Sequence, residues 1–303
     1  MNVKRLYDLI NMDSAEEILH ETEAVLRIAY PDVDAGPVIQ VFHDTMSLYA
    51  GTYPGYQACS TGYHDFQHCA ETLLAMIRLI HGADAEGLRL ANPAVKLGLI
   101  AALLHDTGYI PAKHEAIGAG GTHTAAHVSR SMNFAGHYGR QHGFTPDDIK
   151  ACQTMICCTD FDADFDAIMW PSHDVELLGK MLAAADLLAQ MADRAHLEKL
   201  FYLYQEFQEG LVSGYDSAED LLRKTMDFHS IADDRFKNKL ENTDRFMAAH
   251  FMQRWGIEDD LYRLAIDNEK AYLRTIMRHK DEDISSRLRR KGIVKKIRSE
   301  KKS

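Results

Sequence analysis

The segment NPAVKLGLIAALLHD, residues 92–106, indicates the fold class of this chain. Asn92 suits a helix cap and Pro93 the first turn, and the eight residues after Lys96 are apolar on nearly every side of the helix that they would form. A helix without a polar face is buried on all sides, as the central helix of an all-helical domain is. The stretch nevertheless ends on His105 and Asp106, and two polar groups at such a depth require partners.

Helical periodicity continues along most of the chain. Apolar stripes and helix start and stop signals predict helices in residues 15–30, 35–51, 61–82 (after an initial loop, with a stop at Gly82), 124–143, 145–160 and 174–194. Residues 197–277 alternate charged and apolar side chains at helical spacing, and we find no strand-like alternation, repeat or clear linker. We therefore predict an all-α fold, with one compact multi-helix bundle of nine to twelve helices over residues 1–277.

The charge of the chain is uneven. Its net charge is −11, which argues against a general nucleic-acid-binding protein. Residues 278–303 nevertheless hold eleven Lys or Arg against four Asp or Glu. We expect this basic C-terminal tail to be a solvated helix end or a frayed terminus. An anionic partner, such as nucleic acid or a membrane surface, is the alternative.

Cysteine usage and hydropathy bear on the compartment. The five cysteines are odd in number and form no CxxC pair, and the N-terminus does not resemble a signal peptide. No run of eighteen or more apolar residues occurs, so we expect no membrane span. A reducing cytoplasm fits these features best.

Three apolar segments are interrupted by residues that commonly bind metals. The segment YHDFQH contains His64 and His68, four positions apart, and the two would share a face if helical. His105 and Asp106 end the central stretch, and Asp186 lies inside MLAAADLLAQM. Each could be a satisfied core residue when taken alone. Together they predict a site for a divalent cation with the ligands His68, His105, Asp106 and Asp186.

The order and context of these motifs resemble the HD superfamily of metal-dependent phosphohydrolases. Within it, YHDFQHCAETL, IAALLHDTGY, QTMICCTDFDADF and LAAADLL resemble motifs of class I 3′,5′-cyclic nucleotide phosphodiesterases, in the same order over about residues 60–190. The resemblance implies hydrolysis of a cyclic nucleotide or a related small phosphoester by an all-helical domain. It also implies two divalent metal ions, of Mg, Mn, Zn or Fe.

The resemblance also implies roles for individual residues. His68, His105, Asp106 and Asp186 would hold the first metal, and Asp106 would bridge to the second. His64 would be the general acid, with Thr159 and Asp160 lining the site. Asp65 stands where the phosphodiesterases have Asn, the segment after Asp106 is shorter and carries glycines at 118, 120 and 121, and the glutamine that holds the purine has no clear counterpart.

Several further residues are weaker candidates. His127 and Glu115 are possible ligands of the second metal, and Asp65 or Asp160 could keep His64 charged and oriented. The aromatic cluster in LFYLYQEFQEG, residues 200–210, suits core packing, although one or two rings could stack on a base. Gln190 and Gln205 are candidates for base contact.

Two other functions compete with phosphoester hydrolysis. A di-iron oxygenase on the same fold would need His123 or His127 as an additional ligand. A non-catalytic module for sensing or assembly would not need to retain the full set of ligands and His64. A homodimer is compatible with each of these functions.

Overall fold

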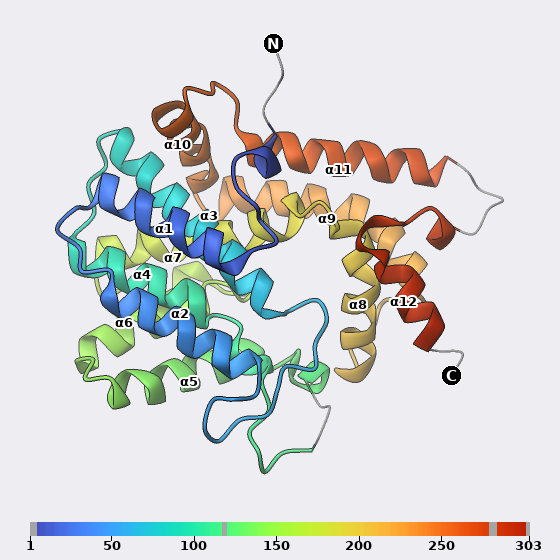
Figure 1. Cartoon of the computed structure of the whole chain (residues 1–303), viewed down its shortest axis with the longest axis horizontal. Coiled ribbons are helices and arrows are strands. Elements are labelled where there is room, and N and C mark those ends of the chain that lie inside the picture. Colours follow the sequence, from blue (N-terminus) through green and yellow to red (C-terminus); the bar gives the residue numbers. More distant parts are fainter. Residues whose placement is uncertain (1–4, 117–119, 279–283, 301–303) are drawn as a thin grey trace.

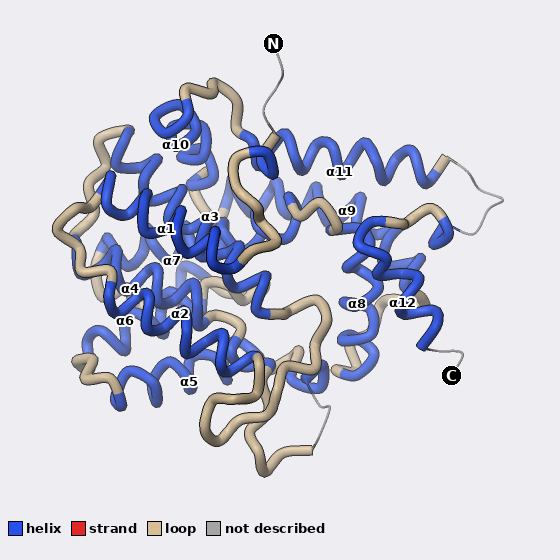
Figure 2. The backbone as a smooth tube through the Cα atoms, in the orientation of Figure 1, coloured by secondary structure: helices blue, strands red, loops and turns tan. Residues whose placement is uncertain are grey.

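The protein consists of helices and connecting loops (Figures 1 and 2). The computed structural model describes residues 5–116, 120–278 and 284–300. Within these ranges the chain forms twelve α-helices, and its only β-type pairing is an isolated bridge between Tyr56 and Ala112. The predicted all-α class is confirmed. No described helix combines the length and the hydropathy needed to span a membrane.

The helices occupy most of the described chain. Their bounds are α1 (Ala15–Ala29), α2 (Gly36–Tyr49), α3 (Phe66–Ala85), α4 (Asn92–Leu104), α5 (His127–Gln141), α6 (Pro146–Cys157), α7 (His173–Ala192), α8 (His196–Glu209), α9 (Ala218–Asn238), α10 (Phe246–Trp255), α11 (Leu261–Met277) and α12 (Ile293–Glu300).

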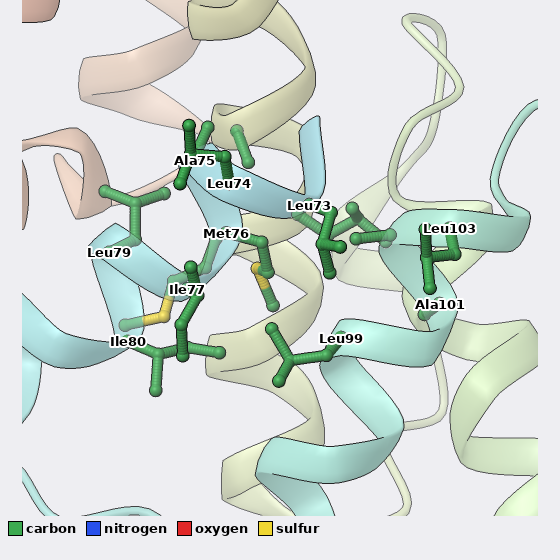
Figure 3. Close-up of a cluster of buried hydrophobic side chains, with 14 of the residues drawn as sticks. Leu73, Leu74, Ala75, Met76, Ile77, Leu79, Ile80, Leu99, Ala101 and Leu103 are labelled. Carbon is green, nitrogen blue, oxygen red and sulfur yellow. The ribbon is translucent and has the colours of Figure 1, made fainter. Parts of the chain in front are cut away.

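Helices α3, α4 and α7 form the centre of the larger hydrophobic core. Helix α3 packs against α1, α4, α7 and α10, and its residues 68–83 are all buried. Figure 3 shows how Leu73, Met76 and Ile77 of α3 lie against Leu99 and Leu103 of α4. Residues 92–104 therefore form the buried helix that their apolar composition predicts.

Two helix boundaries differ from the sequence-based expectation. Helix α3 continues past Gly82 to Ala85, because this glycine serves packing and not termination. A Cβ at position 82 would lie 1.8 Å from the carbonyl oxygen of Phe246, so the missing side chain lets α10 approach. Asn92 is the first residue of α4 and not its cap, which is Ala91.

A second, smaller core lies beside the first and joins α8, α9, α11 and α12. Figure 1 shows α12 next to α8, near the C-terminus. Ile293, Val294 and Ile297 of α12 are buried in this core, and Arg290 forms an ion pair with Glu269 at 2.6 Å. The expectation of a solvated tail is therefore wrong for residues 284–300, because apolar residues at helical spacing give the basic segment a buried face. Residues 279–283 and 301–303 lie outside the described chain, as do positions 118 and 119 of the glycine-rich segment.

Candidate metal centre

The end of α4 brings two adjacent ligand candidates to one point. The helix ends at Leu104, and Asp106 leaves the helical conformation with φ −109° and ψ 8°. The Nε2 atom of His105 consequently lies 3.3 Å from Oδ2 of Asp106. Gly108 follows in a short 3-10 turn, where a Cβ would lie 2.0 Å from the carbonyl oxygen of His127. Glycine is thus required here for the close approach of α5.

Helices α3 and α7 supply the other two predicted ligands. His68, in the first turn of α3, places Nε2 3.3 Å from Nε2 of His105 and 3.4 Å from Oδ2 of Asp106. Oδ1 of Asp186, from the middle of α7, lies 3.0 Å from Nε2 of His68 and 3.7 Å from that of His105. The four residues that the sequence singled out therefore converge from three helices.

The donor atoms of this cluster fit a divalent cation. Oδ2 of Asp106 is buried and has no hydrogen-bond partner. Nδ1 of His105 lies 2.8 Å from the carbonyl oxygen of Ala102 and donates to it, which directs Nε2 at the cluster. Buried polar atoms are normally satisfied, and imidazole nitrogens beside carboxylate oxygens are common ligands of divalent metals. His68, His105 and Asp106 form a group able to hold a metal ion, with Asp186 beside it.

Burial and charge act against each other in this cluster. Burial alone would raise the pKa of the Asp106 carboxyl, but His105 and His68 hold it well below its usual range. Burial would likewise lower the pKa of His68, but the carboxylates of Asp106 and Asp186 outweigh it and raise that pKa to about 9. The carboxylates therefore stay ionised, whereas His68 and His105, whose pKa values are raised by those carboxylates, must each release a proton before Nε2 can bind a cation.

His64 lies outside helix α3, unlike His68. Asp65 caps α3 by accepting from the backbone N–H of His68 at 2.9 Å, so the helix begins only at Phe66. The two imidazoles are 6.0 Å apart between ring centroids and differ in their partners. Nδ1 of His64 lies 2.6 Å from Oε2 of Glu206, while Oε1 of Glu206 accepts from the backbone N–H of Tyr63 at 2.6 Å.

Glu206 is the functional candidate that sequence reasoning missed. We expected Asp65 or Asp160 to orient His64, but the Asp65 carboxylate serves as a helix cap. Glu206 is 142 residues from His64 along the chain and is buried on α8, three positions after Leu203. A carboxylate on the apolar face of a helix was the available signal, and the many charges of that helix concealed it.

His127 lies on the opposite side of Asp106 from the two ligand histidines. Its Nε2 is 3.9 Å from Oδ1 of Asp106, and its Nδ1 lies 2.6 Å from the carbonyl oxygen of Thr124. The ring of Tyr109 stacks on His64 and on His127, at centroid distances of 4.3 and 4.7 Å, and the two imidazoles are 6.2 Å apart. Burial lowers the pKa of His127, which favours the neutral, ligating form.

Two further candidates lie away from the cluster. Glu115 forms a paired ion contact with Arg130 at 2.9 and 3.0 Å, and this hydrogen bonding lowers its pKa to about 2. Asp160 is exposed, and its Oδ1 accepts from the backbone N–H of Asp162 at 3.0 Å. Thr159, by contrast, lines the cavity described next. His123 lies 3.9 Å from Glu115 and does not line that cavity.

A cavity of about 270 Å³ opens onto the metal cluster. One end is polar and is lined by His64, Asp106, His127 and Asp186. The rest is lined mainly by apolar side chains of α8 and α9. The site is therefore formed at the junction of the two hydrophobic cores.

Comparison of the chain with models of protein families, with curated proteins and with solved structures found no match.

Proposed function

We propose that this chain is a metal-dependent phosphoester hydrolase of the HD type. One observation carries the proposal: a buried Asp106 oxygen without a hydrogen-bond partner faces two imidazoles, in the same cavity as a histidine held by a buried glutamate. A hydrolase of this kind needs an activated water and a proton donor, and the cavity offers a set of residues for each.

His68, His105, Asp106 and Asp186 would hold the divalent ion. When bound, such an ion supplies a nucleophile by lowering the pKa of water from ~15.7 toward ~7, and it neutralises phosphate charge. The protein holds the ligands ready: Ala102 fixes the ring of His105, and Gln190 donates to Oδ1 of Asp186 at 2.5 Å. Partners of this kind orient metal ligands.

His64 would donate the proton to the leaving oxygen. Glu206 accepts from Nδ1, so Nε2 is the nitrogen left for a substrate in the cavity. A proton donor must lie within hydrogen-bond reach of the atom that it protonates, and an imidazole held in place on the cavity wall meets this requirement. The ring of Tyr109, stacked on His64, fixes its plane.

His127 allows for a second ion that Asp106 would bridge. Its Nε2 faces Oδ1 of Asp106, while the first ligand group faces Oδ2. The same placement is what the alternative, a di-iron oxygenase, would need. Metal content and oxygen consumption distinguish the two activities.

A substrate panel tests the proposal. Protein loaded with Mg²⁺, Mn²⁺ or Zn²⁺ should be assayed on cyclic AMP, cyclic GMP, nucleoside monophosphates and bis(4-nitrophenyl) phosphate, with a chelated sample as the control. We expect turnover of at least one phosphoester that disappears on chelation. Tightly bound iron and oxygen consumption, without turnover of any phosphoester, would contradict the hydrolase and support the oxygenase.

A further inference from the structure

The half of the cavity away from the metal cluster has an apolar wall. Leu200, Leu203 and Phe207 lie at positions i, i+3 and i+7 of α8, and all three line the cavity. Leu221 and Phe228, seven residues apart on α9, line the facing side. Helical spacing therefore directs one side-chain row of each helix into the same space.

Several polar side chains that also line the cavity are already bonded within the protein. The amide of Gln190 donates to Asp186, and its oxygen accepts from the Tyr63 hydroxyl at 3.2 Å. The guanidinium of Arg235 donates to the carbonyl oxygens of residues 158, 160 and 161. Lys224 bonds to Asp220 at 2.7 Å. These groups have little capacity left for a ligand.

In the half of the cavity that faces α8 and α9, two polar groups have no hydrogen bond to another described residue. Both ring nitrogens of His196 are buried and have no hydrogen-bond partner in the described part of the chain. The second is the hydroxyl of Tyr215, for which no hydrogen bond to a described residue is found, and the ring of Tyr215 stacks on Phe207 at 5.4 Å. Gln205, the second candidate for base recognition, does not line the cavity. A nucleobase presents several donors and acceptors along its edge, and each one buried without a partner costs on the order of tenfold in affinity.

We infer that the substrate is a phosphoester whose organic group is apolar, an alkyl or aryl group and not a nucleobase. The inference rests on the proposed function, which places the phosphate at the metal cluster and so directs the organic group toward α8 and α9. His196 and Tyr215 then accommodate one or two polar atoms on an otherwise apolar group.

Binding of a homologous series tests this inference separately from turnover. We would titrate the Zn²⁺-loaded protein with n-alkylphosphonates from methyl to hexyl, and with cyclic AMP, by calorimetry. Each buried methylene contributes about fourfold in affinity, so Kd should fall on the order of 10³-fold across the series. A change below about twofold across the series, or tighter binding of cyclic AMP than of hexylphosphonate, would overturn the inference.

A pair of leucine variants locates the effect. Leu203→Asn should weaken hexylphosphonate at least about tenfold and leave methylphosphonate unchanged, since only the longer chain reaches α8. Leu211→Asn is the matched control, because Leu211 is 89% exposed, does not line the cavity and has a φ of 54° that asparagine tolerates. Equal effects of the two variants would count against the inference. If Kd falls strongly with chain length but no phosphoester is turned over, the apolar cavity is supported and the hydrolase is contradicted. If Kd does not change with chain length but a phosphoester is turned over rapidly, the hydrolase is supported and the apolar substrate is contradicted.

Discussion

The two hydrophobic cores differ in how their helices are built. Helices α3, α4 and α7 of the larger core are apolar over long stretches. In α4, every residue from Val95 to Leu104 except Lys96 is buried and is either apolar or glycine. Helices α8, α9 and α12 of the smaller core carry many charges and bury only one face each. The larger core contributes all four candidate metal ligands, whereas the smaller one contributes Glu206 and the apolar wall of the cavity.

We therefore expect the two cores to have different roles at the site. The larger core places the donor atoms of the candidate metal ligands 3.0–3.7 Å apart, and the adjoining amphipathic helices line the space in which a substrate would lie. Variants in the larger core should therefore abolish chemistry, and variants in the smaller core should reduce it or alter stability.

The largest effect is expected from Asp106→Asn. Its oxygens face His68, His105 and His127, so the amide removes a metal ligand and the shared negative charge. The metal would stabilise the transition state by several kcal/mol, so its loss corresponds to a fall in kcat/KM on the order of 10³-fold or more. Steady-state kinetics and elemental analysis would measure it. The exposed Asp162→Asn should match the wild type, and an active, metal-loaded Asp106→Asn would remove Asp106 from the site.

A smaller effect is expected from the pair of residues that joins the two cores. His64→Gln should lower kcat about 100-fold with metal content unchanged, as loss of a general acid does. Glu206→Gln should lower it about tenfold, because Glu206 only positions His64. In the His64→Gln background the Glu206 change should have no further effect on kcat.

Additive losses in that cycle would mean that Glu206 acts through the fold and not through His64. Glu258→Gln, an exposed change of the same kind, serves as the control for both backgrounds.

Next comes the packing of the smaller core. Ile297→Ala in α12 should lower the free energy of unfolding by about 2–3 kcal/mol, since this side chain is only 3% exposed. Urea denaturation compares it with Lys296→Ala, an exposed neighbour that should change stability little. If both variants matched the wild type, the basic segment would be a solvated tail after all.

The smallest effect concerns pH. Burial lowers the pKa of His229, in α9, to about 4, and neither ring nitrogen has a hydrogen-bond partner in the described chain. The unfolded protein binds this proton near pH 6.5, so stability is lost as the pH falls from about 6.5 toward 4. At pH 5 the wild type should have lost about 1–2 kcal/mol of its free energy of unfolding that the His229→Phe variant retains. If the urea midpoints of the two proteins changed equally between pH 7.5 and 5, His229 would not be the cause of this pH dependence.

The same contrast explains what could be predicted from the sequence. An aspartate inside LAAADLL or a histidine after IAALL is conspicuous, because the other residues of those short stretches are apolar. Glu206 has several charged neighbours, and only tertiary packing of α8 reveals that it faces His64. The cap at Asp65 and the close approach at Gly82 also depend on contacts that a local pattern does not contain.

If α3, α4 and α7 hold a metal ion, a crystal grown with Zn²⁺ should contain it. We expect an anomalous difference peak within about 2.0–2.2 Å of Nε2 of His68, Nε2 of His105 and an oxygen of Asp106. A structure at saturating Zn²⁺ with no peak at that position, and with the imidazoles hydrogen-bonded to the carboxylates instead, would contradict this expectation.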